Sequence, residues 1–359
     1  MKTVNVTLAH HTYPIYIGKD LLKNAELLQQ HIAHKQVMVV SNETIAALFL
    51  SSLTPALNHY QMSNTLLPDG ESYKTLDTAT QIFNDLVTDK HRRNTTLIAL
   101  GGGVIGDITG FAAHCYQRGV PFIQIPTTLL AQVDSSIGGK TGVNHPDGKN
   151  MIGAFHQPQC VIIDINTLKT LPEREYRSGL AEVIKHALIL DKENLNWLES
   201  HIGAIMARES EALIEMIEHS CKIKANIVVQ DEKEHLGIRQ LLNFGHTFAH
   251  AIETATHYST YLHGEAVAIG MVMAARLSQQ LGQISEADVM RITTLLQQAG
   301  LPTTLEQSPL PPQLTIDLMR HDKKNKTDQL SVVALKSLGH AEFYTEIDLQ
   351  LVEKTLSIF

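Results

Sequence analysis

The chain has few cysteines, and their positions exclude two kinds of site. Three occur in 359 residues, Cys115, Cys160 and Cys221, and no two of them form a C-x-x-C pair. An odd number of widely spaced thiols supports neither a disulfide framework nor a thiolate metal site. The pattern is typical of a reducing compartment, so we expect the protein in the cytoplasm.

Long hydrophobic runs and an excess of basic residues are also missing. No apolar run reaches the roughly 18 residues that a membrane-spanning helix needs. The first 20 residues, MKTVNVTLAHHTYPIYIGKD, lack the continuous apolar segment of a signal peptide. The net charge is −8, whereas proteins that bind nucleic acid favour a basic surface. We therefore expect neither a membrane nor a nucleic-acid partner, and any anionic ligand must be held by local basic groups.

The composition that remains can form a large core, because 43% of the residues are hydrophobic. In the first half, short β-rich runs alternate with helical patterns such as residues 75–87. The runs are VMVVS (37–41), LIAL (97–100), FIQI (122–125) and VIIDI (161–165). This alternation predicts an α/β domain with a mostly parallel, Rossmann-like sheet over residues 1–170.

The second half has a helical period instead. Residues 179–190, 209–229 and 265–282 carry apolar side chains at helical spacing. A further helix is predicted over 285–300, between the start signal at Ser285 and the stop signal at Gly300. LSVVAL (330–335) is a short possible strand. We predict a mainly α-helical domain over 171–359, with the boundary near TLKTLPERE (167–175).

A glycine-rich turn lies between a predicted strand and a predicted helix. In ALGGGVIGDITGF (99–111), Gly101, Gly103 and Gly106 fit the pattern G-x-G-x-x-G. Such glycines let backbone N–H groups approach a diphosphate at a helix N-terminus. The motif starts about 100 residues into the chain, however, and the next strand, PFIQIP, brings no ribose-binding acid. The turn therefore indicates either a tight strand–helix connection or a nucleotide site in a non-standard Rossmann-like fold.

A second glycine cluster, DSSIGGKTGVNHPDGKN (134–150), resembles a Walker A loop without being one. That motif would need glycine at the position of Asp134. The segment still gathers Asp134, Lys140, Lys149 and Asn150, and lysines in such a loop suit a phosphate group. A flexible, solvated loop is the alternative interpretation.

Histidines and a carboxylate in the second half suggest a metal site. NFGHTFAHAIE (243–253) places His246 and His250 on one helix face, His263 opens the next helix, and Glu182 lies in GLAEVIKH (179–186). Two histidines and one carboxylate form a catalytic zinc set with an open position. The chain contains 19 histidines, so any one of them could be an ordinary surface or core residue. The spacing leaves open which of them bind metal and which bind substrate.

Taken together, these segments resemble the 3-dehydroquinate synthase family of the shikimate pathway, which leads through chorismate to the aromatic amino acids. The matching stretches run in order over most of the chain: GESYK, LGGGVIGDITGF, YQRGVPFIQIPTTLLAQVDSSIGGKTGVN, GKNMIGAFHQP, GLAEVIKH, DEKEHLGIRQLLNFGHTFAHAIE, HGEAVAIGM and DKKNK. The resemblance implies a two-domain carbon–oxygen lyase with NAD and Zn²⁺ or Co²⁺ in the cleft between the domains. It implies that 3-deoxy-D-arabino-heptulosonate 7-phosphate is converted to 3-dehydroquinate and phosphate.

The resemblance also implies roles for individual residues. Metal ligands would be Glu182, His246 and His263. NAD contacts would be Asn42, Glu71, Lys74, Gly102, Gly103, Val104, Asp107, Thr127 and Thr128, together with Lys140 and Lys149. Substrate contacts would be Asp134, Lys140, Lys149, Asn150, Lys185, Lys224, Arg239, Asn243, His250 and one of Lys323 or Lys324. Arg118 would reach the phosphate site of a neighbouring subunit, which implies a homodimer.

The implied chemistry has no net redox change. NAD⁺ takes a hydride from C5 of the substrate, phosphate leaves by β-elimination, and the hydride returns. Ring opening and an intramolecular aldol step then close the carbocycle. The leaving phosphate can itself act as the base for the elimination, so no single protein base is assigned.

Three alternatives remain at this point. A polyol dehydrogenase of the glycerol-dehydrogenase type would use the same fold, NAD and metal, but would need neither the lysine cluster nor Arg239. Another sugar-phosphate cyclase, acting on sedoheptulose 7-phosphate or glucose 6-phosphate, would have no substrate carboxylate for Arg239 to bind. A non-catalytic nucleotide-binding or scaffold protein would be expected to lack bound metal and NAD.

Overall fold

The computed structural model describes residues 1–305, 310–320 and 330–359, and the chain folds into two compact units. The first unit comprises Met1–Leu171 and Leu213–Lys233, and the second comprises Pro172–Ala212 and Glu234–Phe359. The predicted domain limits, 1–170 and 171–359, differ from this division in one segment. Residues 213–233, which form most of a long helix, group with the α/β unit.

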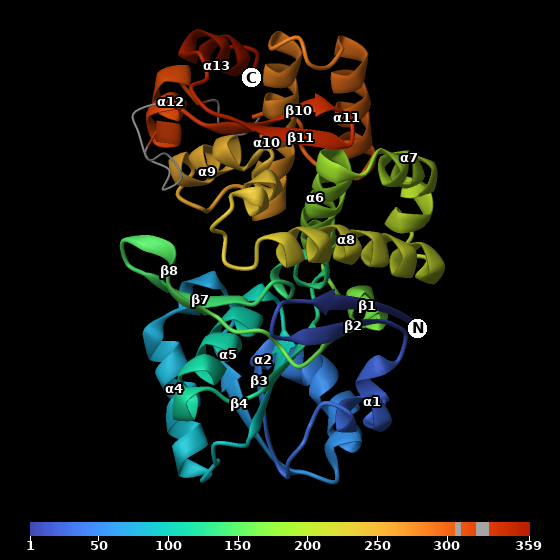
Figure 1. Ribbon diagram of the computed structural model, residues 1–359, viewed down its shortest axis with the longest axis vertical. Coiled ribbons are helices and arrows are strands. Elements are labelled where there is room, and N and C mark those ends of the chain that lie inside the picture. The colour runs from blue at the N-terminus through green and yellow to red at the C-terminus, as the bar shows by residue number, and fades with distance from the viewer. Residues whose placement is uncertain (306–309, 321–329) are drawn as a thin grey trace. The chain divides into compact units, whose positions relative to one another are not determined.

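A mostly parallel sheet forms the centre of the first unit (Figure 1). Within the described residues it contains seven strands in the order β1-β2-β9-β6-β5-β3-β4. Their bounds are β1 (Lys2–Thr7), β2 (Thr12–Gly18), β3 (Gln36–Asn42), β4 (Gln61–Leu67), β5 (Thr96–Gly101), β6 (Phe122–Pro126) and β9 (Val161–Asp164). Among these described strands, β1 and β2 pair antiparallel and every other pair is parallel. The predicted α/β fold with a mostly parallel sheet is confirmed.

The strands are continuously apolar because helices cover both faces of the sheet. Met38 and Val40 of β3 pack in a core with the helices α4 and α5, whereas Val37 and Val39 point to the opposite face and pack with α1 and α3. The helices of this unit are α1 (Ala25–Gln29), α2 (Glu43–Ile45), α3 (Ser51–Leu53), α4 (Leu76–Thr88), α5 (Gly103–Cys115) and most of α8 (Ser210–Gln230). Figure 1 shows α4 and α5 on one side of the sheet and α1 on the other.

The strand order places a topological switch between β3 and β5. From β3 the chain adds β4 on one side, then crosses back and adds β5, β6 and β9 on the other side. At such a switch the connections leave in opposite directions, which opens a crevice at the carboxyl ends of the strands. The carboxyl ends of β3 and β5 are therefore where this unit is expected to bind a ligand.

The segment expected to be a glycine-rich loop is largely a hairpin. β7 (Lys140–His145) pairs antiparallel with β8 (Gly148–Phe155). Gly142 and Gly153 face each other across the pair, and a β-carbon at Gly142 would lie 2.6 Å from the Ile152 carbonyl oxygen. The prediction of a loop over 134–150 is therefore wrong for the residues that form β7 and the start of β8. Gly142 is needed for the close approach of the two strands and does not indicate a loop.

The second unit is mainly helical. Its helices are α6 (Glu173–Leu190), α7 (Lys192–Met206), α9 (His246–Ala255), α10 (His263–Gln280), α11 (Glu286–Gln298), α12 (Pro312–Arg320) and α13 (Leu349–Leu356). α10 is buried along most of its length and is apolar on all sides, as a central core helix must be. The predicted helix over 285–300 is confirmed by α11, and the predicted strand over 330–335 by β10 (Val332–Ser337), which pairs with β11 (His340–Tyr344).

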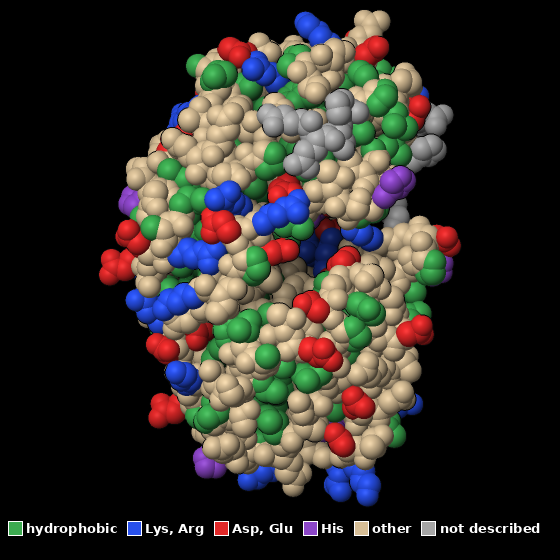
Figure 2. Space-filling model, turned by 180° about the vertical axis from the view of Figure 1, so that it is seen from behind, with side chains coloured by type: hydrophobic (Ala, Val, Ile, Leu, Met, Phe, Trp, Pro, Cys, Tyr) green, Lys and Arg blue, Asp and Glu red, His purple; other side chains and the backbone are tan. Residues whose placement is uncertain are grey.

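The surface of the chain is mixed in character. Figure 2 shows Lys and Arg side chains interspersed with Asp and Glu over the visible face, with apolar side chains between them. Scattered apolar side chains such as Met290 and Val87 are usual on a protein surface. In the described part of the chain, no helix combines the length and the apolar character that crossing a bilayer requires.

Candidate active site

The carboxyl edge of the first unit's sheet has features that suit a nucleotide. Gly102 is the N-cap of α5 and provides no side chain to cap the first turn, so that the helix N-terminus stays open to an anion. A β-carbon at Gly103 would lie 2.9 Å from Ser135 Oγ, which explains the glycine there. The Thr127 N–H donates to the Gly101 carbonyl, at 3.0 Å. The buried Thr127 Oγ1 has no hydrogen-bond partner within the described residues, as expected for an atom that meets a ligand or water.

Beside this edge lies Lys74, a buried lysine that is itself a predicted NAD contact. It binds a second predicted NAD contact, Asp107, and a predicted substrate contact, Asn150. Lys74 Nζ donates to Asp107 Oδ2 at 2.5 Å and to Asn150 Oδ1 at 2.6 Å. Burial raises the pKa of Asp107, and the neighbouring Lys74 opposes that rise. Lys74 is only 4% exposed, so the ion pair holds both side chains in fixed positions.

An asparagine that the sequence analysis did not single out connects this pair to Glu71. Asn144 Nδ2 donates to Glu71 Oε1 at 2.8 Å, and Asn144 Oδ1 accepts from the Asn150 N–H at 2.8 Å. The backbone at Asn150 is left-handed, with φ of 55°, and the hydrogen bond to Asn144 helps to hold it there. Asn144 ends one of the stretches that resemble the family, but the residues around it did not indicate which side chain it would bind.

Five further predicted contacts also lie on this unit. Asn42 ends β3, where its Nδ2 donates to Asp69 Oδ1 at 2.8 Å and its Oδ1 accepts from the Ile45 N–H. Lys224, on α8, donates to Asp134 Oδ1 at 2.5 Å and to the Asp134 carbonyl at 2.6 Å. Val104 is in the first turn of α5, and Thr128 Oγ1 accepts from the Ala131 N–H.

The structure does not bring every predicted residue of the first unit together. Lys140 begins β7, whereas Lys149 lies beside the hairpin turn, about 13 Å of strand away. Arg118 follows α5 and precedes β6, so it lies at the amino edge of the sheet, opposite to the other predicted contacts. Gln117 and Arg118 both have positive φ, of 50° and 68°. The predicted substrate contact at Lys323 or Lys324 lies outside the described residues.

In the second unit, three helices bring a carboxylate and two imidazoles together. Glu182 comes from α6, His246 from the start of α9 and His263 from the start of α10. One ligand atom from each residue lies within 4.8 Å of those of the other two. His246 Nε2 is 3.5 Å from Glu182 Oε1, and His263 Nε2 is 3.7 Å from the same oxygen.

Close helix contacts bring these three side chains to one place. A β-carbon at Gly264, next to His263, would overlap the Ser178 carbonyl oxygen, one turn before Glu182. The Gly264 N–H also donates to Ser178 Oγ at 3.0 Å, which ties α10 to α6. A β-carbon at Gly270 would overlap the carbonyl oxygen of Gly245, the residue before His246. Glycine is therefore required at both helix crossings.

The spacing of these atoms fits a divalent cation. Around a tetrahedral zinc ion with bonds of about 2.0–2.2 Å, ligand atoms lie about 3.3–3.6 Å apart. The two nitrogen–oxygen distances are at or just above this range. Glu182 is fully buried, and its second oxygen, Oε2, accepts a hydrogen bond from Lys185 Nζ. Lys185 thereby fixes the carboxylate so that Oε1 faces both imidazoles.

The two imidazoles have opposite protonation tendencies. Burial and the nearby Lys185 lower the pKa of His246 well below its usual value, so its ring stays neutral with a lone pair available. Burial alone would also lower the pKa of His263, but Glu182 and Glu253 outweigh it and raise the pKa to about 10. A cation that binds here must therefore displace a proton from His263.

The second unit also contains other predicted substrate contacts. His250 is one turn after His246 on α9, and the two ring centroids are 5.7 Å apart. Arg239, in the 3-10 helix Ile238–Asn243, is 4% exposed, and its Nε is 3.5 Å from Glu234 Oε1. Asn243 ends the same short helix. The buried Glu253, which the sequence analysis did not consider, contacts His263 Nδ1.

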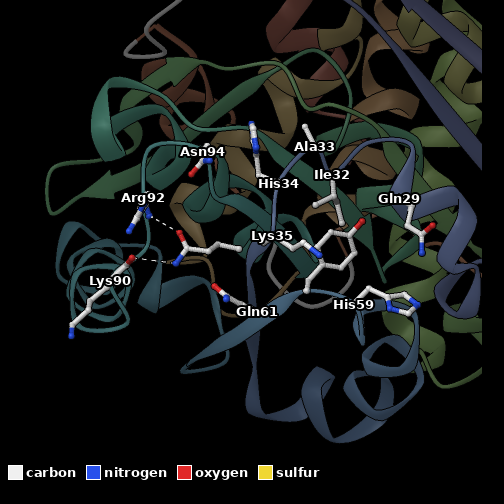
Figure 3. Close-up of a pocket in the computed structure, with 12 residues that line it drawn as sticks. Gln29, Ile32, Ala33, His34, Lys35, His59, Gln61, Lys90, Arg92 and Asn94 are labelled. Atoms are coloured by element: carbon white, nitrogen blue, oxygen red, sulfur yellow. Dashed lines mark hydrogen bonds between the residues drawn. The ribbon is translucent and has the colours of Figure 1, made fainter.

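A hollow at the other end of the first unit's sheet has a different character (Figure 3). It lies at the amino ends of β3 and β4, and its volume is about 990 Å³. His34, Lys35, His59, Lys90 and Arg92 contribute exposed side chains to it. Because these side chains are solvated, we assign no site to this hollow.

The fold and these side chains together define a class. The first unit is a doubly wound α/β fold with a glycine turn at the carboxyl edge of its sheet, and the second supplies a Glu–His–His triad suited to a divalent cation. Together they have the organisation of a metal-assisted, nucleotide-binding α/β enzyme.

The particular family follows from the sequence. The family model of the 3-dehydroquinate synthase N-terminal region matches residues 64–178, and that of the C-terminal region matches residues 179–325. The chain belongs to the 3-dehydroquinate synthase family. A curated 3-dehydroquinate synthase from Nitrosococcus oceani is 54% identical over 356 residues, covering 99% of each chain.

Two solved structures extend the comparison. The 2-epi-5-epi-valiolone synthase from Streptomyces hygroscopicus subsp. jinggangensis, solved with NAD⁺ and Zn²⁺ bound, has a TM-score of 0.88 at 28% identity and covers 98% of each chain. A 2-deoxy-scyllo-inosose synthase, complexed with carbaglucose-6-phosphate, NAD⁺ and Co²⁺, has a TM-score of 0.89 at 26% identity and covers 99% of each chain. The structural relatives therefore include sugar-phosphate cyclases that bind NAD⁺ with a divalent metal.

Proposed function

We propose that this chain converts 3-deoxy-D-arabino-heptulosonate 7-phosphate to 3-dehydroquinate and inorganic phosphate, as an NAD- and metal-dependent carbon–oxygen lyase. It would act in the cytoplasm as a homodimer. The observation that carries the proposal is the Glu182–His246–His263 triad, in a chain that belongs to the 3-dehydroquinate synthase family.

The triad's donor set supports a zinc or cobalt ion. One carboxylate oxygen and two imidazole nitrogens suit either metal, and three protein ligands leave a position open for substrate. When bound, the ion would polarise substrate hydroxyls and NAD would accept and return a hydride, so that no net oxidation results. The chain's own contribution is to keep His246 neutral and to hold Glu182 through Lys185.

The first unit would bind the anionic parts of NAD. The open N-terminus of α5 presents backbone N–H groups and the positive end of the helix dipole, which suit a diphosphate. The Lys74–Asp107 pair gives the neighbouring Asn150 a fixed position. Lys140, Lys149 and Lys224 are assigned to the substrate, whose phosphate carries a charge of about −2.

Arg239 is the group that favours this substrate over those of other cyclases. A guanidinium offers a planar fork that binds a carboxylate with two parallel hydrogen bonds. Arg239 is almost completely buried, and its Nε lies 3.5 Å from Glu234 Oε1, which helps to orient the guanidinium. Sedoheptulose 7-phosphate and glucose 6-phosphate have no carboxylate to offer, so we assign Arg239 to the carboxylate of the heptulosonate.

The test is to follow two products at once with the purified holoprotein. With the heptulosonate phosphate as substrate, we expect phosphate release without net formation of NADH, at NAD concentrations far below that of the substrate. The same assay with sedoheptulose 7-phosphate is expected to give little phosphate. NADH formed in proportion to glycerol consumed would instead establish a polyol dehydrogenase, and no phosphate from any of the substrates would refute the proposal.

A further inference from the structure

His263 is held on both sides of its ring. Its Nδ1 lies 3.2 Å from Glu253 Oε1, and its Nε2 points at Glu182 Oε1. In a neutral imidazole one nitrogen carries the proton and the other carries the lone pair. The partner of Nδ1 therefore decides whether Nε2 is free to bind a cation.

His246 is oriented in the same sense by a different partner. Its Nδ1 lies 3.3 Å from the Phe244 carbonyl oxygen, and its Nε2 also points at Glu182 Oε1. A carbonyl oxygen can only accept, so Nδ1 of His246 is the protonated nitrogen. Both rings thus turn Nε2 to the same oxygen, one directed by the backbone and one by a carboxylate.

Glu253 lies where an ionised carboxylate destabilises the fold unless a hydrogen-bond donor compensates for its burial. It is 6% exposed and lies in the last turn of α9, close to the negative end of the helix dipole. It follows His246 by seven residues, two helical turns, so the two side chains share a helix face. A hydrogen bond from the His263 ring offsets part of the cost of burying this charge.

We propose that Glu253 is a positioning residue for the metal site. It accepts the Nδ1–H of His263, which fixes the tautomer and the rotation of the ring so that Nε2 faces the cation. Glu253 is not a fourth ligand, because it approaches the nitrogen on the far side of the imidazole from Glu182. The inference rests on the metal assignment of the proposed function and adds a residue to it. Carboxylates in this position typically change metal affinity about 10- to 100-fold.

The experiment compares metal affinity in three proteins. Zinc binding by metal-free wild type, Glu253→Gln and Glu199→Gln is measured by competition with a chromophoric chelator, and folding of each metal-free protein is checked by its thermal midpoint. Glu199 is the matched control, because it is a glutamate of the second unit that pairs with Arg291 instead of a triad residue. We expect Glu253→Gln to bind zinc about 10- to 100-fold more weakly and Glu199→Gln to match wild type.

The outcomes distinguish the role of Glu253 from the metal assignment on which it rests. Wild type that takes up no stoichiometric zinc or cobalt overturns the metal assignment and the role of Glu253 with it. Wild type that binds zinc, with an equal affinity in a folded Glu253→Gln protein, overturns only the role of Glu253. Should Glu253→Gln fail to fold, a crystal structure of the zinc-loaded wild type decides: zinc on Nε2 of His263 supports the inference, and zinc on Nδ1 overturns it.

Discussion

Glu182 is the side chain around which the polar groups of the second unit are arranged. Its Oε1 faces both imidazoles, and its Oε2 accepts from Lys185, one turn further along α6. Residue types and spacing selected Glu182, His246, His250 and His263 as candidates, and the family resemblance reduced them to the ligand set Glu182, His246 and His263. Glu253 was missed, although its seven-residue distance from His246 places both on one helix face. A lone glutamate in a helix has many possible partners, and only the fold shows which one it has.

Arg239 gives a prediction at this scale. Replacing it with alanine removes the fork proposed for the substrate carboxylate, and replacing it with lysine keeps the charge but loses the bidentate geometry. We expect the KM for the heptulosonate phosphate to rise by about 10- to 100-fold in Arg239→Ala and by less in Arg239→Lys, from a loss of about 1.5–3 kcal/mol of binding. The metal content should stay unchanged. Steady-state kinetics and zinc analysis measure both quantities.

Arg291→Ala is the control for that comparison. Arg291 pairs with Glu199 on the surface of the same unit, so its loss should leave the KM near that of wild type. An unchanged KM in Arg239→Ala would show that the buried guanidinium serves the fold rather than the substrate.

At the scale of elements, periodicity and capping signals predicted the long helices α4, α6, α8, α10 and α11, whereas α7, α12 and α13 were not predicted. The start of α11 was predicted from Ser285, and its side chain accepts from the Asp288 N–H as expected. The hairpin β7–β8 was missed because its glycines resembled those of a phosphate-binding loop. Glycine gives the same local signal when it permits a turn, a bound anion or a close strand neighbour, and the neighbour is unknown until the chain folds.

The contact between α10 and α6 is testable by adding one methyl group. Gly264→Ala places a β-carbon against the Ser178 carbonyl and must push α10 away from α6. We expect the free energy of unfolding to fall by at least about 1–3 kcal/mol. Zinc binding should also weaken, because His263 moves with Gly264. Thermal unfolding and chelator competition measure the two effects.

Gly203→Ala provides a matched control for the same substitution in a helix. Gly203 lies in α7, and no atom is within 4 Å of where its β-carbon would be. Alanine is the better helix former by about 1 kcal/mol, so this variant should be as stable as wild type or more stable. If Gly264→Ala unfolds at the wild-type temperature and binds zinc normally, the helices are not in close contact at this point.

At the scale of the whole molecule, a site assembled from distant segments links ligand binding to stability. Glu182 and His263 are 81 residues apart in the chain, from 263 minus 182, so the triad exists only in the folded state. A cation that binds the folded form alone stabilises it by about 2.7 kcal/mol at 100 times its Kd. The proton that must leave His263 makes this stabilisation larger as the pH rises.

Zinc should therefore raise the thermal midpoint of the metal-free protein. We expect a shift on the order of 4 °C for wild type and little shift for His263→Ala, which should also lose turnover. His235→Ala, which removes an exposed histidine outside the triad, should respond like wild type. Equal zinc-induced shifts in wild type and His263→Ala, measured by calorimetry, would remove His263 from the ligand set.

The proposed homodimer makes a separate prediction through Arg118. Arg118 lies at the amino edge of its own sheet, and we assign it to the phosphate site of the partner subunit. Arg118→Ala and Lys185→Ala should each be inactive alone, whereas mixing them under conditions of subunit exchange should restore about a quarter of wild-type activity. This fraction follows from random pairing, in which half of the dimers are mixed and each mixed dimer has one intact site. Mixtures that stay inactive despite exchange would show that Arg118 does not act across subunits.

By itself, the sequence determined the mostly parallel α/β sheet and the helical second half, and it offered candidate residues for a metal and a nucleotide site. The fold follows from hydrophobic periodicity, which is a property of neighbouring residues, whereas the candidates come from short motifs and from the family resemblance. Only the tertiary structure decided which atoms meet: Lys74 with Asp107, Asn144 with Glu71, and Glu253 with His263. It also decided that residues 213–233 belong with the α/β unit. Such contacts depend on how helices and strands pack, and no local pattern encodes the partner that packing brings within hydrogen-bonding distance.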